Sequence, residues 1–382
     1  MKMLDVYPVF DIEPVKAQGS YIWDDKGDRY LDFYGGHAVI SVGHTHPHYV
    51  NRINDQLNKL SFYSNSVKIS IQEECAVKLG ELSGYPDYDL FMCNSGAEAL
   101  ENAMKLAAFN FEGDKIIVFE KGFHGRTSMA VSATDNPKIQ TKFDNKTSMV
   151  RLPLNDLNAF EANMDSSVCA VIVEGIMGIG GIHEPSTAFL ESLRKQCDQH
   201  GAALILDEVQ SGFGRSGHFF AHQKVNVKAD IIAMAKGMGN GFPVGGVLVS
   251  PKLETWKGML GSTFGGNHLA CAATLGVLEV IEKEDLMTNA TKRGQQLKEH
   301  FQKWQQVKEI RGSGLMLGLV FDFPVAHMRK SLVYDERVFT GSSSEPNTLR
   351  LLPPLTIGDE EIEEFIKACE SVFAKSELME AS

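Results

Sequence analysis

Five stretches of this 382-residue chain place glycine or polar residues directly after a short apolar run. They are CNSGAE (93–98), EKGFHGRT (120–127), EGIMGIGG (174–181), DEVQSGFGRSG (207–217) and AKGMGNGFPVGG (235–246). Short apolar runs of this kind are typical of buried parallel strands, and open parallel sheets bind their ligands beyond the carboxyl ends of the strands. Five such strand ends together are more specific than any single motif.

Lys236 follows the apolar run DIIAMA and precedes a glycine-rich segment. A phosphate-binding loop of the nucleotide type needs its lysine after the glycines, followed by Ser or Thr, so that interpretation fails. A solvent-exposed lysine on a turn is the remaining alternative, but it explains the glycines poorly. An amine that is removed from water loses its proton readily and can form an imine. The pattern favours a nucleophilic lysine.

Asp207 and Ser95 end two other apolar runs. A carboxylate after ALIL should be largely buried and needs a cationic or hydrogen-bonding partner, although taken alone a structural ion pair explains Asp207 better. Ser95 opens a predicted helix, whose free N–H groups suit a phosphate. An S-x-x-E capping box between Ser95 and Glu98 explains the same residues equally well.

Taken together, the three features predict a single binding site. A lysine that forms an imine, a carboxylate that keeps a pyridine nitrogen protonated and a helix N-terminus that grips a phosphate are what a protein supplies to pyridoxal phosphate.

The elements that must position these residues can be read from the apolar pattern. Strand-length runs, apolar on both faces, alternate with loops or helical patterns and predict a mostly parallel sheet that is covered on both sides. The runs are YDLFMC, KIIVFE, VCAVIVE, AALILD, DIIAMA and GGVLVS. Helices are predicted over 99–109 and over 189–200, the second ending at Gly201.

The pattern of apolar residues changes after Asn267. We expect a long helical stretch through Trp304, strands over 314–321 and 348–357, and a closing amphipathic helix behind an acidic first turn. GSYIWDDKGDRYLDF predicts a hairpin near the N-terminus that packs with this part. The expected division is a large α/β domain over 46–274 and a smaller α+β domain made of 1–45 and 275–382.

Composition narrows the class of partner. With 37 basic and 49 acidic residues the formal charge is −12, which argues against nucleic acid or an anionic membrane. The N-terminus lacks the layout of a signal peptide and no run is long enough to span a bilayer, so a cytoplasmic location is expected. The six cysteines show no C-x-x-C pair, and neither a disulfide framework nor a zinc cluster is indicated.

The chain resembles the class III (subgroup II) pyridoxal-phosphate aminotransferases of fold type I, most closely the acetylornithine/succinylornithine aminotransferases. The resemblance covers nearly the whole chain and keeps its order. It rests on GGHAVISVGHTHP, NSGAEALENAMKLA, GFHGRT, DEVQSGFGRSG, AKGMGNGFPVGG, GSTFGGNHLAC and TLRLLPPLTI. It implies a seven-stranded, mostly parallel sheet and pyridoxal 5′-phosphate as the cofactor.

The resemblance also implies roles for individual residues. Lys236 would hold the cofactor covalently and move the proton, and Asp207 would pair with the ring nitrogen. The other residues implied to contact the cofactor are Ser95, Gly96 and Ala97 at the phosphate, Phe123 and Val209 on the ring faces, Gln210 at the ring hydroxyl, and Thr263 from the neighbouring subunit. Thr263 therefore implies a homodimer with shared sites.

Arg126 would clamp the α-carboxylate of the substrate, a bidentate task that lysine performs poorly. Arg350 matches a second carboxylate-binding arginine of the family. Glu174 is also expected among the substrate-binding residues. The implied reaction moves the δ-amino group of N-acetyl- or N-succinyl-ornithine to 2-oxoglutarate, giving the N-acyl-glutamate semialdehyde and glutamate, in arginine biosynthesis. Ornithine, 4-aminobutyrate and N-succinyl-diaminopimelate stay open as donors.

One block departs from the family pattern. EGIMGIGG stands where EPIQGEGG is usual, so Ile179 replaces the glutamate that in ornithine aminotransferases pairs with the residue matching Arg350. Arg350 would then lack that counter-ion. We hypothesise that this favours a donor whose tail carries its own carboxylate, such as N-succinylornithine.

Other interpretations fit the sequence less well. The HTHPH run, with His44, His46 and His48, invites a metal site, but no carboxylate or cysteine cluster accompanies it and no metal is expected. The glycine-rich loops do not give G-x-G-x-x-G between a strand and a helix, which disfavours a dinucleotide site. A glutamate-semialdehyde-type aminomutase shares the expected fold and cofactor and remains the rival activity, while a non-catalytic relative would be expected to lack Lys236 or Asp207.

Overall fold

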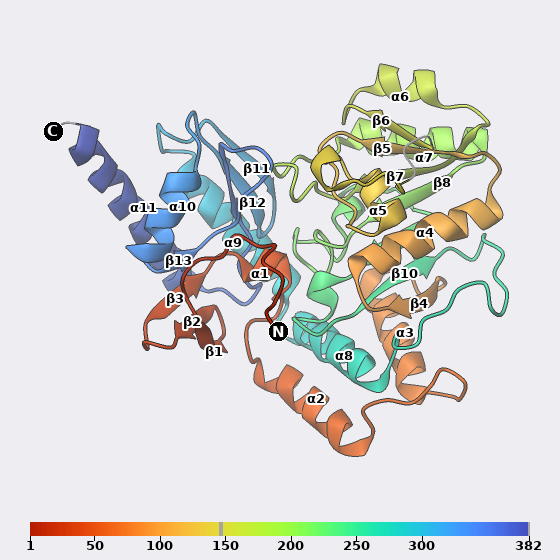
Figure 1. Cartoon of the computed structure of the whole chain (residues 1–382), viewed down its shortest axis with the longest axis horizontal. Helices are drawn as coiled ribbons and strands as arrows, with labels where there is room; N and C mark the ends of the chain where they lie inside the picture. Colours follow the sequence, from red (N-terminus) through yellow and green to blue (C-terminus); the bar gives the residue numbers. More distant parts are fainter. Residues whose placement is uncertain (145–147, 381–382) are drawn as a thin grey trace.

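The computed structural model describes residues 1–144 and 148–380, and of residues 376–380 it describes only the helix that contains them. Three sheets organise this part of the chain, with seven, four and three strands. Figure 1 shows the seven-stranded sheet on the right and the blue C-terminal elements on the left. The arrangement leaves the loops at one edge of the large sheet facing the C-terminal part.

The seven-stranded sheet has the order β4-β10-β9-β8-β7-β5-β6. Only β10 runs antiparallel to its neighbours, so the expected mostly parallel sheet is confirmed. Its strands are β4 (Asp89–Cys93), β5 (Lys115–Phe119), β6 (Met149–Leu152), β7 (Val168–Glu174), β8 (Ala203–Asp207), β9 (Ile231–Met234) and β10 (Gly245–Val249). All six apolar runs form strands, and β6 is the one strand of this sheet that the sequence analysis missed.

Helices cover both faces of this sheet. Successive side chains of a strand point to opposite faces, and in β8 Ile205 packs in the cluster of α4 (Gly96–Asn110), whereas Leu204 and Leu206 pack with α7 (Thr187–His200). Both helices were expected. The C-cap of α7 is Gly201, whose φ of 67° suits a residue without Cβ.

The expected long helical stretch through Trp304 is two helices, α8 (His268–Lys283) and α9 (Leu286–Phe301). Asp285 interrupts it with a left-handed φ of 49°. Helix α8 packs against α2 (Pro47–Lys59) and α3 (Ser70–Ser83). The remaining short helices are α1 (Gly35–Ala38), α5 (Ser128–Ala133) and α6 (Leu157–Asn163), and the 3-10 turns are η1 (Pro137–Ile139), η2 (Ala221–Lys224) and η3 (Lys236–Met238).

The three-stranded sheet lies in the C-terminal part, with the order β11-β12-β14. It contains β11 (Glu309–Ser313), which was not expected, β12 (Met316–Val320) and β14 (Thr348–Leu351). The strand expected over 348–357 ends at Leu351, because Pro353 and Pro354 have no N–H to donate. Helices α10 (Ala326–Tyr334) and α11 (Asp359–Glu380) belong to the same part.

The N-terminal strands join this C-terminal part, as expected. The four-stranded sheet contains the predicted hairpin of β2 (Tyr21–Asp24) and β3 (Arg29–Asp32), flanked by β1 (Pro14–Gln18) and β13 (Val338–Phe339). Strand β3 pairs in parallel with β13, and the ring of Phe33 stacks on that of Phe365 at 4.1 Å. The division at residues 45/46 and 274/275 stays a prediction.

A close backbone approach connects the three-stranded sheet to the large sheet. Arg215 is buried and donates to the carbonyl oxygens of Ile40 at 3.3 Å and Leu315 at 3.2 Å. Gly314 lies directly against the backbone at Arg215, and Gly294 of α9 lies against Gly314, since a Cβ at position 294 would stand 2.0 Å from the Gly314 oxygen. The missing side chain of Gly294 therefore lets α9 approach this connection.

We expect Gly294→Ala to destabilise the protein, although alanine is the better helix former by about 1 kcal/mol. The new methyl group would overlap backbone, which cannot rotate away, so a net loss of about 2 kcal/mol is expected in urea unfolding. Gln295→Ala, on the exposed face one residue later, is the matched control and should change the free energy of unfolding by less than about 0.5 kcal/mol. Equal stability of the two variants would contradict the close packing.

Candidate active site

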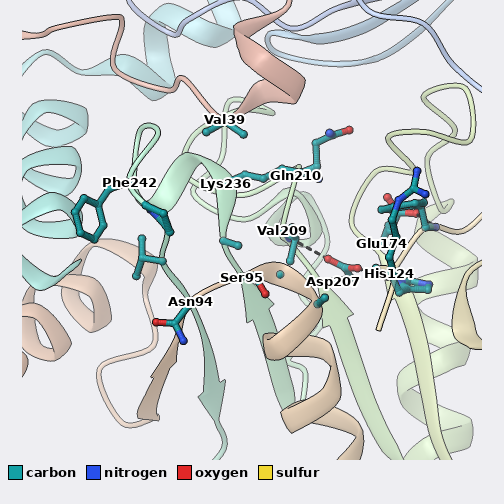
Figure 2. Close-up of a pocket in the computed structure, with 18 of the residues that line it drawn as sticks. Val39, Asn94, Ser95, His124, Glu174, Asp207, Val209, Gln210, Lys236 and Phe242 are labelled. Carbon is teal, nitrogen blue, oxygen red and sulfur yellow. Dashed lines mark hydrogen bonds and ion pairs between the residues drawn. The ribbon is translucent and has the colours of Figure 1, made fainter. Parts of the chain in front are cut away.

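The predicted functional loops meet at one edge of the seven-stranded sheet. Strands β4, β5, β7, β8 and β9 are parallel to one another and end at this edge, while the antiparallel β10 begins there. The loops enclose a cavity of about 430 Å³ (Figure 2). The side chains and backbone that line it include Val39, Asn94, Ser95, Gly96, Ala97, Phe123, His124, Arg126, Glu174, Asp207, Val209, Gln210, Lys236 and Phe242.

Asp207 is held in place from two sides. Its Oδ2 atom lies 2.8 Å from Nδ1 of His124, and its Oδ1 atom accepts a hydrogen bond from the Val209 N–H at 3.0 Å, which Figure 2 marks with a dashed line. Asp207 and His124 are both buried. A carboxylate in this position is kept from rotating, and it stays available to a ligand in the cavity.

Lys236 lines the same cavity and follows β9, the strand next to the one that ends at Asp207. Burial lowers the pKa of its amine, which the charges of Asp207 and Glu174 partly oppose. The backbone of Lys236 has a φ of 45°, unusual for a residue with a side chain, at the start of the tight η3 turn. A lysine held in this way offers a neutral amine more readily than a lysine on the surface.

Glu174 ends β7 with both carboxylate oxygens occupied by backbone groups. Its Oε1 atom accepts from the Phe123 N–H and its Oε2 atom from the Gly178 N–H, each at 2.9 Å. Burial and the neighbouring charge of Asp207 raise the pKa of Glu174 to about 6. These contacts make Glu174 the residue that orients Phe123 and the turn after β7.

The N-terminus of α4 forms a cradle that only small residues permit. The Ser95 hydroxyl caps the helix by accepting from the Glu98 N–H at 3.2 Å, while the Glu98 carboxylate accepts from Asn94 instead of closing a box on Ser95. A Cβ at Gly96 would stand 2.7 Å from a methyl group of Val209. The first N–H groups of the helix therefore open into the cavity next to Val209, as a phosphate seat requires.

Gln210 connects the cavity to the buried Arg350. Its Nε2 donates to the His37 carbonyl at 3.0 Å, and its Oε1 accepts from Nη1 of Arg350 at 3.3 Å. Arg350 also donates to the Ser342 carbonyl, and none of the described carboxylates forms an ion pair with it. Burial lowers its pKa to about 10.

The other two predicted residues lie further out. Arg126 lines the mouth of the cavity and is exposed. Thr263 is exposed and is absent from the lining of the cavity in its own chain. Arg350 stands behind Gln210 and does not itself line the cavity. The structure thus brings together every predicted cofactor residue except Thr263.

Sequence reasoning missed two residues of the site. His124 was available as the buried histidine of the GFHGRT block, but nothing in the sequence indicates that it meets Asp207, 83 positions away. His37 lies near Gln210 and Arg350, and burial, then Arg350 and Lys236, lower its pKa to about 4. His124 comes from the loop after β5 and His37 from the short α1, and only the fold determines the neighbours of both.

The histidines of HTHPH separate in the structure. His44 contacts Asp32, His46 contacts Glu284 and His48 contacts Glu279. Within residues 1–144 and 148–380, no group of three or more His, Cys, Asp or Glu side chains is placed to hold a metal ion. No described helix combines the length and apolar character needed to cross a membrane.

Comparison with known proteins agrees with this geometry. The model of the family "Aminotransferase class-III" matches residues 5–373. Acetylornithine aminotransferase of Nitrosomonas europaea is 40% identical over 378 residues, covering 95% of both chains, and that of Bacillus subtilis is 40% identical over 380 residues, covering 97% of both. Ornithine aminotransferase from Toxoplasma gondii has a TM-score of 0.91 at 28% identity, covering 98% of this chain and 93% of that one.

The fold and the site thus define an α/β enzyme of the pyridoxal-phosphate type. The chain belongs to the class-III aminotransferases, and enzymes of this class use pyridoxal 5′-phosphate. The residues present fit that cofactor, because the glycine cradle at α4, the restrained Asp207 and the buried Lys236 line a single cavity.

Glu174 predicts a pH dependence of stability. Its pKa of about 6 lies above the ordinary 4.5, so the folded protein binds this proton more tightly than the unfolded chain does. The resulting stabilisation is complete below pH 4.5 and is lost as the pH rises through 6. Between these limits the free energy of unfolding of the cofactor-free protein should fall by about 2 kcal/mol relative to that of Glu174→Gln, which cannot titrate.

Urea unfolding at several pH values measures this difference. Glu191→Gln, on the exposed face of α7, is the control and should give no pH-dependent difference from the wild type. If the difference in free energy of unfolding between the wild type and Glu174→Gln also does not change with pH, the raised pKa of the buried Glu174 carboxylate is contradicted.

Proposed function

We propose that this aminotransferase moves the δ-amino group of an N-acyl-ornithine to 2-oxoglutarate, giving the N-acyl-glutamate semialdehyde and glutamate, as a step of arginine biosynthesis. The observation that carries the catalytic part is the meeting of Lys236, Asp207 and the N-terminus of α4 at one cavity. The donor is supported by relatives 40% identical over nearly their full length that are acetylornithine aminotransferases. The expected cytoplasmic location stays a prediction.

Each residue has a task that its surroundings suit. Bound pyridoxal phosphate supplies an electron sink. Lys236 would bind it covalently and carry the proton that leaves the substrate carbon, since its lowered pKa favours the neutral amine. Asp207, held by His124 and the Val209 N–H, would keep a proton on the ring nitrogen.

The remaining cofactor residues bind and orient. Ser95 and the N–H groups of Gly96 and Ala97 would hold the phosphate at the positive end of α4. Phe123, whose N–H is fixed by Glu174, would cover one ring face and Val209 the other. Gln210 would approach the ring hydroxyl.

Two arginines are proposed to hold the carboxylates. Arg126 at the exposed mouth would clamp the α-carboxylate of the donor in a bidentate pair. Arg350 would serve a second carboxylate, and the absence of an ion-pair partner among the described residues leaves its charge available. Glu174 would act on the substrate indirectly, by orienting Phe123 beside it.

A homodimer with shared sites belongs to the same proposal. Large exposed apolar side chains form two aromatic pairs: Phe62, between α2 and α3, lies 5.5 Å from Phe264, and Phe109, at the end of α4, lies 5.0 Å from Trp256. Phe264, next to Thr263, has 61% of its surface exposed. Such side chains favour a protein interface over contact with water. In the proposed dimer, Thr263 of the second copy would reach the phosphate.

The rival donors and the aminomutase can be separated by one screen. N-acetylornithine, N-succinylornithine, ornithine, 4-aminobutyrate and N-succinyl-diaminopimelate are each mixed with the enzyme, and the absorbance change of the bound cofactor is followed. An N-acyl-ornithine should react fastest, and steady turnover should require 2-oxoglutarate, which an aminomutase would not need. Lys236→Ala should lose both the covalent cofactor and the reaction, whereas Lys224→Ala, an ion-pair lysine outside the cavity, should keep them.

Retained turnover in Lys236→Ala would overturn the catalytic role. Fastest reaction of ornithine or 4-aminobutyrate would overturn the proposed donor and leave the cofactor chemistry in place.

Ile179 predicts a donor preference. Its backbone oxygen accepts from the Ser344 N–H at 2.8 Å, and the preceding Gly178 packs against Oε1 of Gln210, which accepts from Arg350. Introducing a carboxylate near an unpaired Arg350 should compete with a substrate carboxylate. In Ile179→Glu, the ratio of kcat/KM for N-succinylornithine to that for N-acetylornithine should fall about tenfold, the equivalent of ~1.4 kcal/mol.

Ile179→Gln has nearly the same shape without the charge and is the matched control, in which the ratio should stay near that of the wild type. The same ratio in Ile179→Glu would show that position 179 does not select the donor.

A further inference from the structure

Glu345 stands at the centre of a charged group that no step above has used. One of its carboxylate oxygens lies 2.6 Å from Nζ of Lys121 and 2.8 Å from Nε2 of His183, and the other lies 2.6 Å from Nη1 of Arg311. We call these four residues the Glu345 cluster. Three basic side chains thus share a single carboxylate.

The cluster joins two different sheets. Lys121 follows β5 and His183 follows the turn after β7, so both belong to loops of the seven-stranded sheet. Arg311 lies on β11, and Glu345 lies in the loop between β13 and β14. The contacts therefore bridge the edge that carries the cavity and the sheet that carries Arg350.

Glycines bring the two sides into direct contact. A Cβ at Gly180 would stand 2.5 Å from the Lys121 carbonyl oxygen, and one at Gly181 would stand 2.6 Å from Oε2 of Glu345. The EGIMGIGG segment is therefore packed against both a lysine and the carboxylate of the cluster. This packing gives a physical reason for glycines that the cofactor does not need.

The loop that contains Glu345 also holds Arg350. Its Ser342 carbonyl accepts from Nε of Arg350, and its Ser344 N–H donates to the Ile179 carbonyl at 2.8 Å. Ser343 caps Glu345, since its hydroxyl accepts from the Glu345 N–H at 3.0 Å. A shift of the loop would carry the Ser342 acceptor with it and change where the guanidinium of Arg350 stands.

The carboxylate of Glu345 is ionised at neutral pH. Burial alone would raise its pKa, but hydrogen bonds from Lys121, His183 and Arg311 lower that pKa to about 2. The carboxylate thus balances its neighbours throughout the neutral range. Without it, Lys121 and Arg311 would face each other across the two sheets with no counter-ion of the cluster between them.

We propose that Glu345 is a positioning residue, which fastens the loop 340–347 to the edge of the large sheet and thereby holds Arg350 in place for a substrate carboxylate. This inference rests on the proposed function for its kinetic consequence. Its structural consequence, a loop held by one carboxylate, can be measured in the enzyme without any substrate.

The test compares Glu345→Gln with Glu309→Gln in the holoenzyme. Glu309 is the matched control, because it also pairs with Arg311, at 2.7 Å, but from the exposed side and without touching the large sheet. In Glu345→Gln, KM for 2-oxoglutarate should rise about tenfold while kcat changes less than about twofold, since the cofactor residues are untouched. Glu309→Gln should leave both near the wild-type values.

Hydrogen exchange supplies the readout that needs no turnover. Peptides that cover 340–347 should exchange at least about tenfold faster in Glu345→Gln than in the wild type, while peptides from α4 and the absorbance of the bound cofactor stay the same. Faster exchange of α4 as well would mean general unfolding. Glu345→Asp, which keeps the charge, then decides, and should restore part of the protection of 340–347.

Unchanged exchange of 340–347 in Glu345→Gln would overturn the proposal, and so would equal effects of Glu345→Gln and Glu309→Gln. If α4 also exchanges faster in Glu345→Gln, a Glu345→Asp variant that restores no protection to 340–347 would overturn the proposal too. If the wild type shows no turnover with N-acyl-ornithines, the proposed function fails, while the exchange data still judge the Glu345 cluster.

Discussion

The site depends on holding one carboxylate still at the end of a buried strand. Asp207 closes a strand whose residues are all buried, so it exchanges water for fixed partners, the His124 imidazole and the Val209 N–H. Its negative charge in turn opposes the effect of burial on Lys236 and raises the pKa of Glu174. After burial itself, the charge of Asp207 is therefore the strongest influence on the pKa of both Lys236 and Glu174.

Close packing is the second constraint, and it explains the many glycines at this edge. Gly96 lets Val209 approach the N-terminus of α4, and Gly178 leaves room for Gln210, whose Oε1 would otherwise stand 1.7 Å from a Cβ. Gly180 and Gly181 do the same for Lys121 and Glu345. These residues contribute no functional group, yet they decide how near the functional groups of different loops can lie.

Local patterns predict the large sheet and most of the cavity. Each apolar run that forms a strand is followed by its own polar residues, so Lys236, Asp207 and Ser95 could be assigned to one edge before any contact was known. Strand β6 escaped because it is an edge strand that contains a charged Arg151 and only one buried residue, Leu152. The break between α8 and α9 escaped because it rests on the left-handed backbone of Asp285. His124 and Glu345 could not be predicted, since their partners lie 83 and 34 or more positions away and meet only in the folded chain.

The residues proposed to hold the cofactor and the arginine proposed to hold the second carboxylate come from different sheets, and this separation bears on specificity. The groups proposed to hold the cofactor come from loops of the seven-stranded sheet, whereas Arg350 comes from β14 of the three-stranded sheet and reaches the cavity only through Gln210. The segment 178–181 and the Glu345 cluster lie where the two sheets meet. Under the proposed function, substitutions there, such as the isoleucine at position 179, would alter which second carboxylate is accepted while the residues around Lys236 stay as they are. One scaffold can thus serve different amine donors with the same chemistry.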